Sequence, residues 1–194
     1  LVDRTRRTAL MKDIEALIIS GVLCSNAAVN DEGIATGDPT EVALLYLATD
    51  HNLTLGILNA NYPRLAEWSF DSNRKMMSVA VGAGLQIAIH SKGAPESILP
   101  LCALTGEQKD KIQKAIETLS SQGRRLLAVA HKPLPVSAAG FDAAAYKDHT
   151  AVENNLTFLG LVAIADPPRQ ESIPAIQACK AAGIKVVMIT GDHP

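Results

Sequence analysis

KMMSVAVGAGLQIAIHS, residues 75–91, determines the architecture of this chain more than any other segment. Two mostly apolar runs, MMSVAV and LQIAIHS, stand on either side of the small residues Gly82, Ala83 and Gly84. Short apolar runs separated by a few small turn residues are typical of a β-hairpin. We therefore predict two antiparallel strands here, and an antiparallel sheet in this part of the chain.

Helices are expected on the N-terminal side of the hairpin. Apolar residues recur at mostly helical intervals over residues 13–29, although Gly21 weakens the pattern. A second helix should begin at Pro39, because Asp38 can cap it and proline suits the first helical position.

On the C-terminal side, Thr105 and Gln108 form a capping box ahead of an apolar stripe. This pattern predicts a helix that ends near Gly123. RLLAVA, residues 125–130, then fits a short buried strand, and the segment HKPLPVSAAGFDAAA, residues 131–145, has the proline and glycine content of a surface loop.

The organisation changes after Asn155. LTFLGLVAIAD, a helical segment QESIPAIQACKAAG and then IKVVMITGD predict strand, helix and strand, hence a parallel βαβ unit. Because near-continuous apolar runs suit strands buried on both faces, a second, parallel sheet is expected. The predicted fold class is α/β, with an antiparallel sheet flanked by helices in a domain over residues 1–155 and an incomplete parallel domain over residues 156–194.

Composition excludes several classes of function. The net charge of -2 and the pI of about 6.2 argue against a nucleic-acid partner. The three cysteines are far apart and the five histidines lack ligand spacing, so neither a disulfide framework nor a metal site is predicted, and a reducing cytosolic setting fits. Apolar stretches fall short of the roughly 20 residues that cross a bilayer. Phosphate-loop, dinucleotide and hydrolase motifs are also missing from the sequence.

One candidate site lies at the carboxyl ends of the two predicted parallel strands, where ligands of such sheets bind. Asp166 ends the first strand, and Thr190, Gly191 and Asp192 end the second. Carboxylates beside a glycine suit Mg²⁺ bound together with a phosphoryl group. Alternatively, the two aspartates cap the helices that follow them.

A second candidate site joins an aromatic residue with cations from separate segments. Its members are Phe70, Lys75, Lys92, Gly93, Arg124 and Arg125. Hairpin geometry returns Lys92 toward Lys75. An aromatic ring can stack on a purine while cations neutralise phosphates, so these groups could hold ATP. Each residue also fits an ordinary role: Phe70 in the core, the lysines in solvent, and Glu41 in a capping box with Asp38.

Taken in order, six motifs resemble those of the P-type (E1–E2) cation-transporting ATPases: GDPTE (37–41), FDSNRKMMSV (70–79), KGAPE (92–96), GRRLLAVA (123–130), DPPR (166–169) and TGDHP (190–194). They cover nearly the whole chain. Their form is most similar to the type II pumps, which include calcium and sodium-potassium ATPases. The resemblance identifies a nucleotide-binding domain followed by part of a phosphorylation domain of the haloacid-dehalogenase-like type.

The resemblance implies a role for each residue of the second site. Phe70 would stack on adenine, Glu41 would meet its amino edge, and Lys75 and Lys92 would line the pocket around base, sugar and phosphates. Arg125 would reach the phosphate chain. Some calcium pumps have a phosphate-binding arginine two residues after the stacking phenylalanine; Ser72 stands at that place here, and Arg74 is a candidate replacement.

The first site would lie near the γ-phosphate and Mg²⁺. The resemblance places the phosphorylated aspartate, in a D-K-T-G-T motif, before Leu1, and a G-D-G-x-N-D motif after Pro194. We therefore expect a monomeric fragment that binds ATP but forms no phosphoenzyme. Its parent would transport cations, with calcium a family-level expectation, and would hold this part on the cytoplasmic face of a membrane. Its partners would be ATP and the remaining phosphorylation, actuator and transmembrane domains.

Two rival functions stay open at this point. A soluble haloacid-dehalogenase-like phosphatase would share the predicted parallel sheet, but needs a nucleophilic aspartate that is not visible in the sequence. A regulatory binding module without a nucleotide would make the lysines dispensable for ATP affinity.

Overall fold

The computed structural model describes residues 4–30, 32–137, 141–146, 148–165, 171–187 and 189. The chain divides into two compact units, residues 1–164 and 165–194. The domain boundary expected after residue 155 stays a prediction. In the described residues, no helix has both the length and the apolar character that a membrane span requires.

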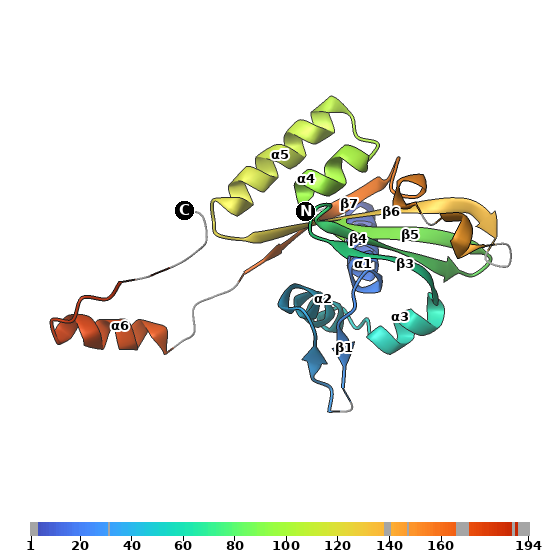
Figure 1. Ribbon diagram of the computed structural model, residues 1–194. Coiled ribbons are helices and arrows are strands. Elements are labelled where there is room, and N and C mark those ends of the chain that lie inside the picture. The colour runs from blue at the N-terminus through green and yellow to red at the C-terminus, as the bar shows by residue number, and fades with distance from the viewer. Residues whose placement is uncertain are drawn as a thin grey trace. The chain divides into compact units, whose positions relative to one another are not determined.

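A five-stranded antiparallel sheet forms the centre of the first unit (Figure 1). Its strands lie in sequence order: β3 (Arg64–Asp71), β4 (Met76–Ala83), β5 (Gln86–Gly93), β6 (Arg125–Ser137) and β7 (Thr157–Ile164). The predicted hairpin is confirmed as β4 and β5, which pair from Met76 with Gly93 to Ala83 with Gln86. The turn is shorter than predicted, because Gly82 and Ala83 belong to β4 and only Gly84 and Leu85 connect the strands.

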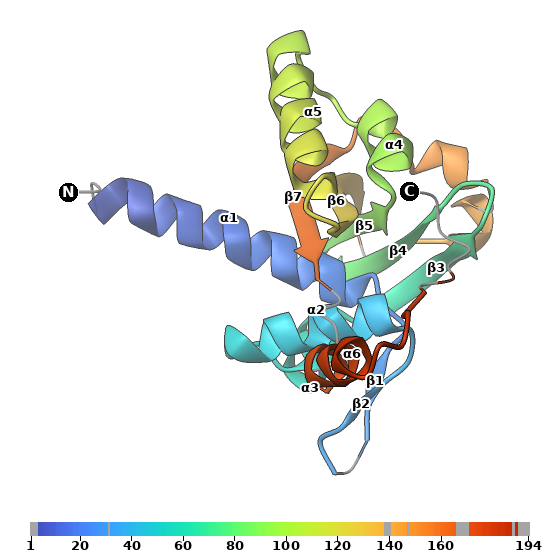
Figure 2. The same ribbon diagram turned by 90° about the vertical axis from the view of Figure 1, so that its left-hand side faces the viewer.

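Helices cover both faces of this sheet (Figure 2). One face carries α1 (Arg4–Leu23), α2 (Pro39–Asp50) and α3 (Leu55–Asn61), and the other carries α4 (Pro95–Ile98) and α5 (Gly106–Ser120). Side chains of β4 alternate between two cores: Met77 and Val79 pack among residues of α1 to α3, whereas Met76 packs with Ile98. Strand β4 is therefore buried on both faces although the sheet is antiparallel.

Local capping signals located two helices correctly. Helix α2 begins at Pro39, and the Asp38 carboxylate accepts a hydrogen bond from the Thr40 backbone N–H at 2.8 Å. Helix α5 follows the predicted capping box of Thr105 and Gln108. Both begin where a side chain satisfies backbone donors that have no partner within the helix.

The first helix has different bounds from those expected. It spans Arg4–Leu23 instead of residues 13–29, and Ala28–Val29 forms β1, which pairs with β2 (Ala35–Thr36). Arg64 donates hydrogen bonds to the backbone oxygens of Leu23 and Ser25, both at 2.7 Å. These bonds satisfy carbonyls where the helix ends, which the apolar periodicity could not reveal.

The loop predicted over residues 131–145 is partly wrong, because β6 continues to Ser137 through Pro133 and Pro135. Pairing with β7 ends at His131, which lies opposite Thr157. Beyond that point β6 has no β7 neighbour, so prolines, which lack an N–H, are tolerated there as they are on edge strands.

The strand expected to open a parallel βαβ unit belongs to the antiparallel sheet instead. Strand β7 pairs antiparallel with β6, from Ile164 with Arg125 to Thr157 with His131. An apolar run indicates that a strand is covered by other elements, but it does not indicate the direction of the neighbouring strand.

The helix of that expected unit is present as α6 (Ser172–Ala181) in the second unit. Residues 184–187 and 189 are not in a strand, and the rest of the expected second strand lies outside the described residues. The parallel segment of a haloacid-dehalogenase-like domain is therefore not found in the described part of the chain.

Candidate functional site: a pocket at the edge of the sheet

A cavity of about 520 Å³ opens where β4, β5 and β6 approach the start of α2. It contains all six residues of the chain predicted to bind a nucleotide: Glu41, Phe70, Lys75, Lys92, Gly93 and Arg125. Arg124, the remaining cation of the predicted constellation, is not part of the described cavity wall. Segments that lie up to 84 residues apart in the sequence, from Glu41 to Arg125, therefore share one hollow.

Strand register produces this convergence. Met77 lies opposite Lys92, and Met76 lies opposite Gly93, so the end of β5 returns to the beginning of β4 as predicted. Gly93 in turn lies opposite Ala128, which brings the first residues of β6 to the same place. The pocket thus lies at one end of three adjacent strands.

Lys92 and Glu41 form a charged pair deep in this pocket. The Lys92 ammonium lies 2.6 Å from Glu41 Oε1 and donates to Ser25 Oγ at 2.7 Å. Only 7% of the Lys92 side chain and 14% of the Glu41 side chain are exposed. Burying both charges is costly, so each must keep its partner, and removing one would leave an uncompensated charge.

Glu41 does not act as the capping-box partner of Asp38. Its Oε2 accepts a hydrogen bond from the backbone N–H of Asn26 at 2.8 Å. Glu41 therefore joins α2 to the chain that follows α1, while Oε1 holds Lys92. Each carboxylate oxygen can accept a second hydrogen bond, so the carboxylate can still receive a donor from a ligand.

Phe70 and Lys75 stand at the mouth of the cavity. Phe70 is 63% exposed, so the alternative that it packs in the core is wrong. Lys75 forms an ion pair with Glu96 at 3.1 Å in which both side chains are more than half exposed. An exposed pair of this kind contributes at most about 1 kcal/mol, so little energy opposes its rearrangement around a ligand.

Gly93 has a steric reason to be glycine. A Cβ atom there would lie 2.5 Å from the carbonyl oxygen of Lys75 and 2.5 Å from the Cβ of Met76. Any side chain would push the beginning of β4 away from the end of β5, and this is where the pocket lies.

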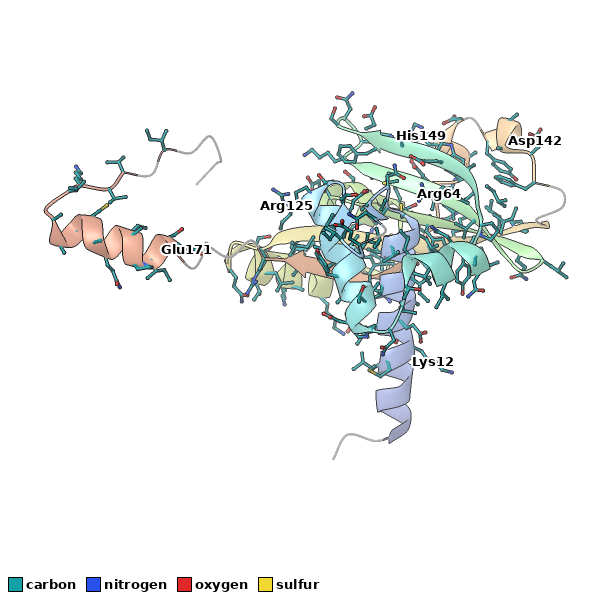
Figure 3. All side chains as sticks on the ribbon, turned by 90° about the horizontal axis from the view of Figure 1, so that it is seen from below. Lys12, Arg64, Arg125, Asp142, His149 and Glu171 are labelled. Carbon is teal, nitrogen blue, oxygen red and sulfur yellow. The ribbon has the colours of Figure 1, made fainter. Side chains whose placement is uncertain are left out.

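Arg125, labelled in Figure 3, is exposed at the beginning of β6. Its guanidinium donates to Thr40 Oγ1 at 3.3 Å, which is a long hydrogen bond. The guanidinium therefore lies next to the beginning of α2, where backbone N–H groups also favour an anion.

Sequence reasoning missed seven residues of the wall: Asn26, Asp38, Thr40, Met77, Ala94, Leu126 and Leu127. Asp38 and Thr40 belong to the GDPTE motif and Ala94 to KGAPE, so the motifs could have included them. Asn26 carries no local signal, because it reaches the site through its bond to Glu41.

The other predicted site cannot be located. Asp166, Thr190, Gly191 and Asp192 lie outside the described residues. Within the described residues, no group of three or more metal-ligating side chains gathers that could hold an ion.

The pocket combines an apolar wall, an exposed aromatic ring and cations contributed by separate segments. These are the properties of a ligand site that takes a flat, partly apolar group attached to an anionic one. The fold and the pocket together define an α/β domain with a cavity suited to a small molecule beside an antiparallel sheet.

Comparison with known proteins identifies the family. Residues 13–171 match the family described as P-type ATPase, cytoplasmic domain N. The chain therefore belongs to the P-type ATPase family.

Three relatives illustrate the similarity. A probable cation-transporting P-type ATPase of Mycoplasma genitalium is 43% identical over 88% of this chain and 19% of its own length. Calcium-transporting ATPase 1 of Bacillus cereus is 36% identical over 98% of this chain and 22% of its own length. A sodium/potassium exporting P-type ATPase of Schizosaccharomyces pombe is 35% identical over 92% of this chain and 18% of its own length. The chain thus spans about a fifth of the curated relatives that it matches.

Proposed function

We propose that this chain binds ATP within a longer P-type ATPase that couples ATP hydrolysis to cation transport across a membrane. The observation that carries the proposal is the convergence of six motif residues on one cavity. The names of the relatives, which include calcium-transporting ATPases, support calcium or another type II cation as the transported ion. The chain would lie on the cytoplasmic face of that membrane.

The proposed binding mode follows the geometry of the pocket. Phe70 stacks on the adenine ring, an interaction worth about 1–3 kcal/mol per base in proteins that bind nucleic acids. Glu41 accepts a hydrogen bond from the adenine amino group with its free acceptor capacity. Lys75 breaks its ion pair with Glu96 and binds the phosphates. Lys92 stays paired with Glu41 and forms the cationic floor of the pocket. Arg125 meets the phosphate chain at the rim.

Catalysis in this proposal is a matter of positioning. Phosphoryl transfer depends mainly on holding the nucleotide in line with its acceptor and on neutralising charge. The acceptor aspartate and the actuator and transmembrane domains would belong to other parts of the parent protein. Residues of the second unit would contribute to the phosphorylation domain and lie near Mg²⁺ and the γ-phosphate: Asp166, Thr190, Gly191 and Asp192. This chain alone should then bind ATP without forming a phosphoenzyme.

A titration with ATP, followed by backbone amide signals in NMR, tests the proposal. Signals around Phe70 and Lys92 should move together, and their titration gives the affinity. Phe70→Ala should weaken ATP and adenosine alike, because stacking does not involve the phosphates. Tyr46→Ala is a matched control, since Tyr46 is an exposed aromatic residue, at 54%, outside the cavity wall.

Lys75→Ala separates phosphate binding from base binding. It should weaken ATP and leave adenosine unchanged, whereas Lys111→Ala, which breaks an exposed pair with Glu107 on α5, should change neither. Lys92 is unsuitable for this test, because its removal would leave the buried charge of Glu41 without its ion-pair partner. The absence of any shift around Phe70 and Lys92 at saturating ATP would contradict the proposal.

No specific observation favours either rival function. The phosphatase hypothesis rested on a parallel strand pair, and β7 lies in the antiparallel sheet instead. The hypothesis of a regulatory module without a nucleotide predicts that Lys75→Ala leaves ATP affinity unchanged, so the same variant tests it.

A further inference from the structure

Arg74 and Glu153 form an ion pair that is not part of the described wall of the pocket. Glu153 lies in the segment that precedes β7, 79 residues after Arg74. Its side chain is 3% exposed, and that of Arg74 is 20% exposed. A carboxylate buried to this degree needs charged and hydrogen-bonding partners.

Glu153 has such partners on two segments, the turn that contains Arg74 and strand β4. The Nη1 atom of Arg74 lies 2.7 Å from each of its carboxylate oxygens. Ser78 of β4 donates to Oε1 at 2.7 Å, and Ser78 Oγ lies 2.8 Å from Ser91 Oγ of β5. Glu153 is thereby fixed to the centre of the sheet and offers Arg74 a rigid anchor.

Arg74 belongs to the turn between β3 and β4, which follows one proposed ligand-binding residue, Phe70 near the end of β3, and contains another, Lys75. Its Nη2 donates to the backbone oxygen of Ser69 at 3.0 Å, one residue before Phe70. Its own backbone N–H donates to Asp71 Oδ1 at 3.0 Å, one residue after Phe70. The Arg74 side chain therefore holds the backbone just before Phe70, and the Arg74 backbone N–H binds the side chain of Asp71 just after it.

Lys75 adopts a conformation that needs this support. Its φ angle is +53°, in the left-handed region that a lysine rarely occupies. Phe70 and Lys75 are themselves mostly exposed, so their side chains do little to fix the turn. The contacts of Arg74 with Ser69 and Glu153 instead connect the turn to the sheet.

We infer that Arg74 is a positioning residue for the nucleotide site, and that its ion pair with Glu153 holds the end of β3, with Phe70, and the following turn, with Lys75, in the ligand-binding conformation. The inference rests on the proposed function. It also argues against Arg74 as a replacement phosphate ligand, because the Glu153 carboxylate and the Ser69 carbonyl oxygen already hold its guanidinium. A turn ordered in advance spares the ligand the entropic cost of ordering it.

Two variants test this role. Arg74→Met removes the anchor but leaves the charge of Glu153 buried, so it can unfold the chain. The double variant Arg74→Met with Glu153→Gln removes both charges and keeps an amide that can bond to Ser78. Lys132→Met is the matched control: Lys132 donates to the backbone and side-chain oxygens of Asn154, so it holds the same segment as Glu153 without touching the turn.

Affinities for ATP and for adenosine, measured by NMR titration, are the first readout. The double variant should weaken adenosine by a factor of roughly ten, because the ring of Phe70 is displaced. It should weaken ATP by at least as much, because Lys75 is displaced as well. Lys132→Met should bind both ligands as the unmodified chain does. A loss confined to ATP would overturn the inference, because it would make Arg74 a direct phosphate ligand. Unchanged affinity in the double variant would also overturn it.

Hydrogen exchange in the ligand-free chain is the second readout, and it does not depend on ATP binding. The Lys75 backbone N–H donates to the Asp71 carbonyl oxygen within the turn. Its exchange should accelerate at least tenfold in the double variant and stay unchanged in Lys132→Met. If the unmodified chain binds no ATP, the proposed function fails while this measurement still decides whether Arg74 orders the turn. Unchanged exchange at Lys75 in the double variant would overturn the inference by itself.

Discussion

Replacing Gly93 with alanine should damage both the stability of the fold and the pocket. The added Cβ would lie 2.5 Å from Lys75 O, 2.5 Å from Met76 Cβ and 2.7 Å from Met76 Cα. Carbon atoms of side chains essentially never come within 3.0 Å of such neighbours. None of the three atoms is the end of a flexible side chain, so the first residues of β4 and the last of β5 must separate.

The magnitude follows from the kind of strain involved. Overpacking of a well-packed site typically costs about 1–3 kcal/mol. For a domain of this size, about 2 kcal/mol corresponds to a decrease in melting temperature of roughly 4–8 °C. The separation also moves Lys75 relative to Lys92, since Met77 lies opposite Lys92 in the ladder. We therefore expect weaker ATP binding in Gly93→Ala as well.

Thermal denaturation followed by circular dichroism, together with the ATP titration, checks this prediction. Gly56→Ala is the control: Gly56 lies in α3, where an added Cβ meets nothing within 4 Å. The free energy of unfolding of that variant should rise by up to about 1 kcal/mol, because alanine has a higher helix propensity than glycine, and the variant should bind ATP as the unmodified chain does. A Gly93→Ala chain with the melting temperature and the ATP affinity of the unmodified chain would refute the steric argument.

Two further predictions concern titratable groups. Burial, and secondarily the neighbouring His131, lower the pKa of His90 to about 4, so between pH 6.5 and pH 4 the unfolded chain binds more protons at this position than the folded chain does. Neutral His90 therefore makes its full contribution to the free energy of unfolding above pH 6.5 and loses it as the pH falls. Between pH 7.5 and pH 4.5, urea unfolding should show a decrease in this free energy that is about 2–3 kcal/mol smaller in His90→Gln than in the unmodified chain. An equal decrease in both chains would contradict this prediction. Burial also raises the pKa of the Cys24 thiol to about 12 and that of the Cys102 thiol to about 11. Iodoacetamide at pH 8 should therefore modify the half-buried Cys179 first. If mass spectrometry showed Cys24 modified as fast as Cys179, the burial of Cys24 would be refuted.

Features governed by neighbours in the sequence were predictable. The hairpin of β4 and β5 was predicted from two apolar runs and a small turn, and α2 and α5 were predicted from caps at Asp38 and Thr105. These signals work because the interactions behind them join residues a few positions apart.

The partner of β7 was not predictable in the same way. Its apolar sequence correctly predicted a strand, but β7 lies at the edge of the sheet and none of its residues is fully buried. Its pairing with β6 joins residues some 26 to 39 positions apart. Nothing in the composition of a covered strand distinguishes a parallel neighbour from an antiparallel one when helices cover both faces. The continuation of β6 through Pro133 likewise depends on where β7 ends.

The pocket shows the same division between local and distant information. Motif resemblance predicted six residues that the fold brings to one cavity, although their roles with ATP stay predictions. The resemblance did not include Asn26 or Glu153, which hold those residues in place through contacts across 15 and 79 positions of the chain. Supporting contacts of this kind carry no motif, because a backbone N–H, as at Asn26, or any of several side chains could supply the same bond.

Departures from ordinary folding rules gather around this one pocket. The charged side chains that are buried in the described part of the chain are Lys92, which forms the pocket floor, and Glu153, which anchors the turn above it. Among described residues other than glycine, a positive φ occurs at Asn52, Asn155 and Lys75, and lysine adopts that conformation less readily than asparagine does. Buried charge and backbone strain both cost stability, so a chain keeps them where another requirement outweighs the cost. Lys75 and Lys92 line one cavity, and Glu153 holds the turn that ends at Lys75, so these costs support a ligand site by an argument that does not depend on the motifs.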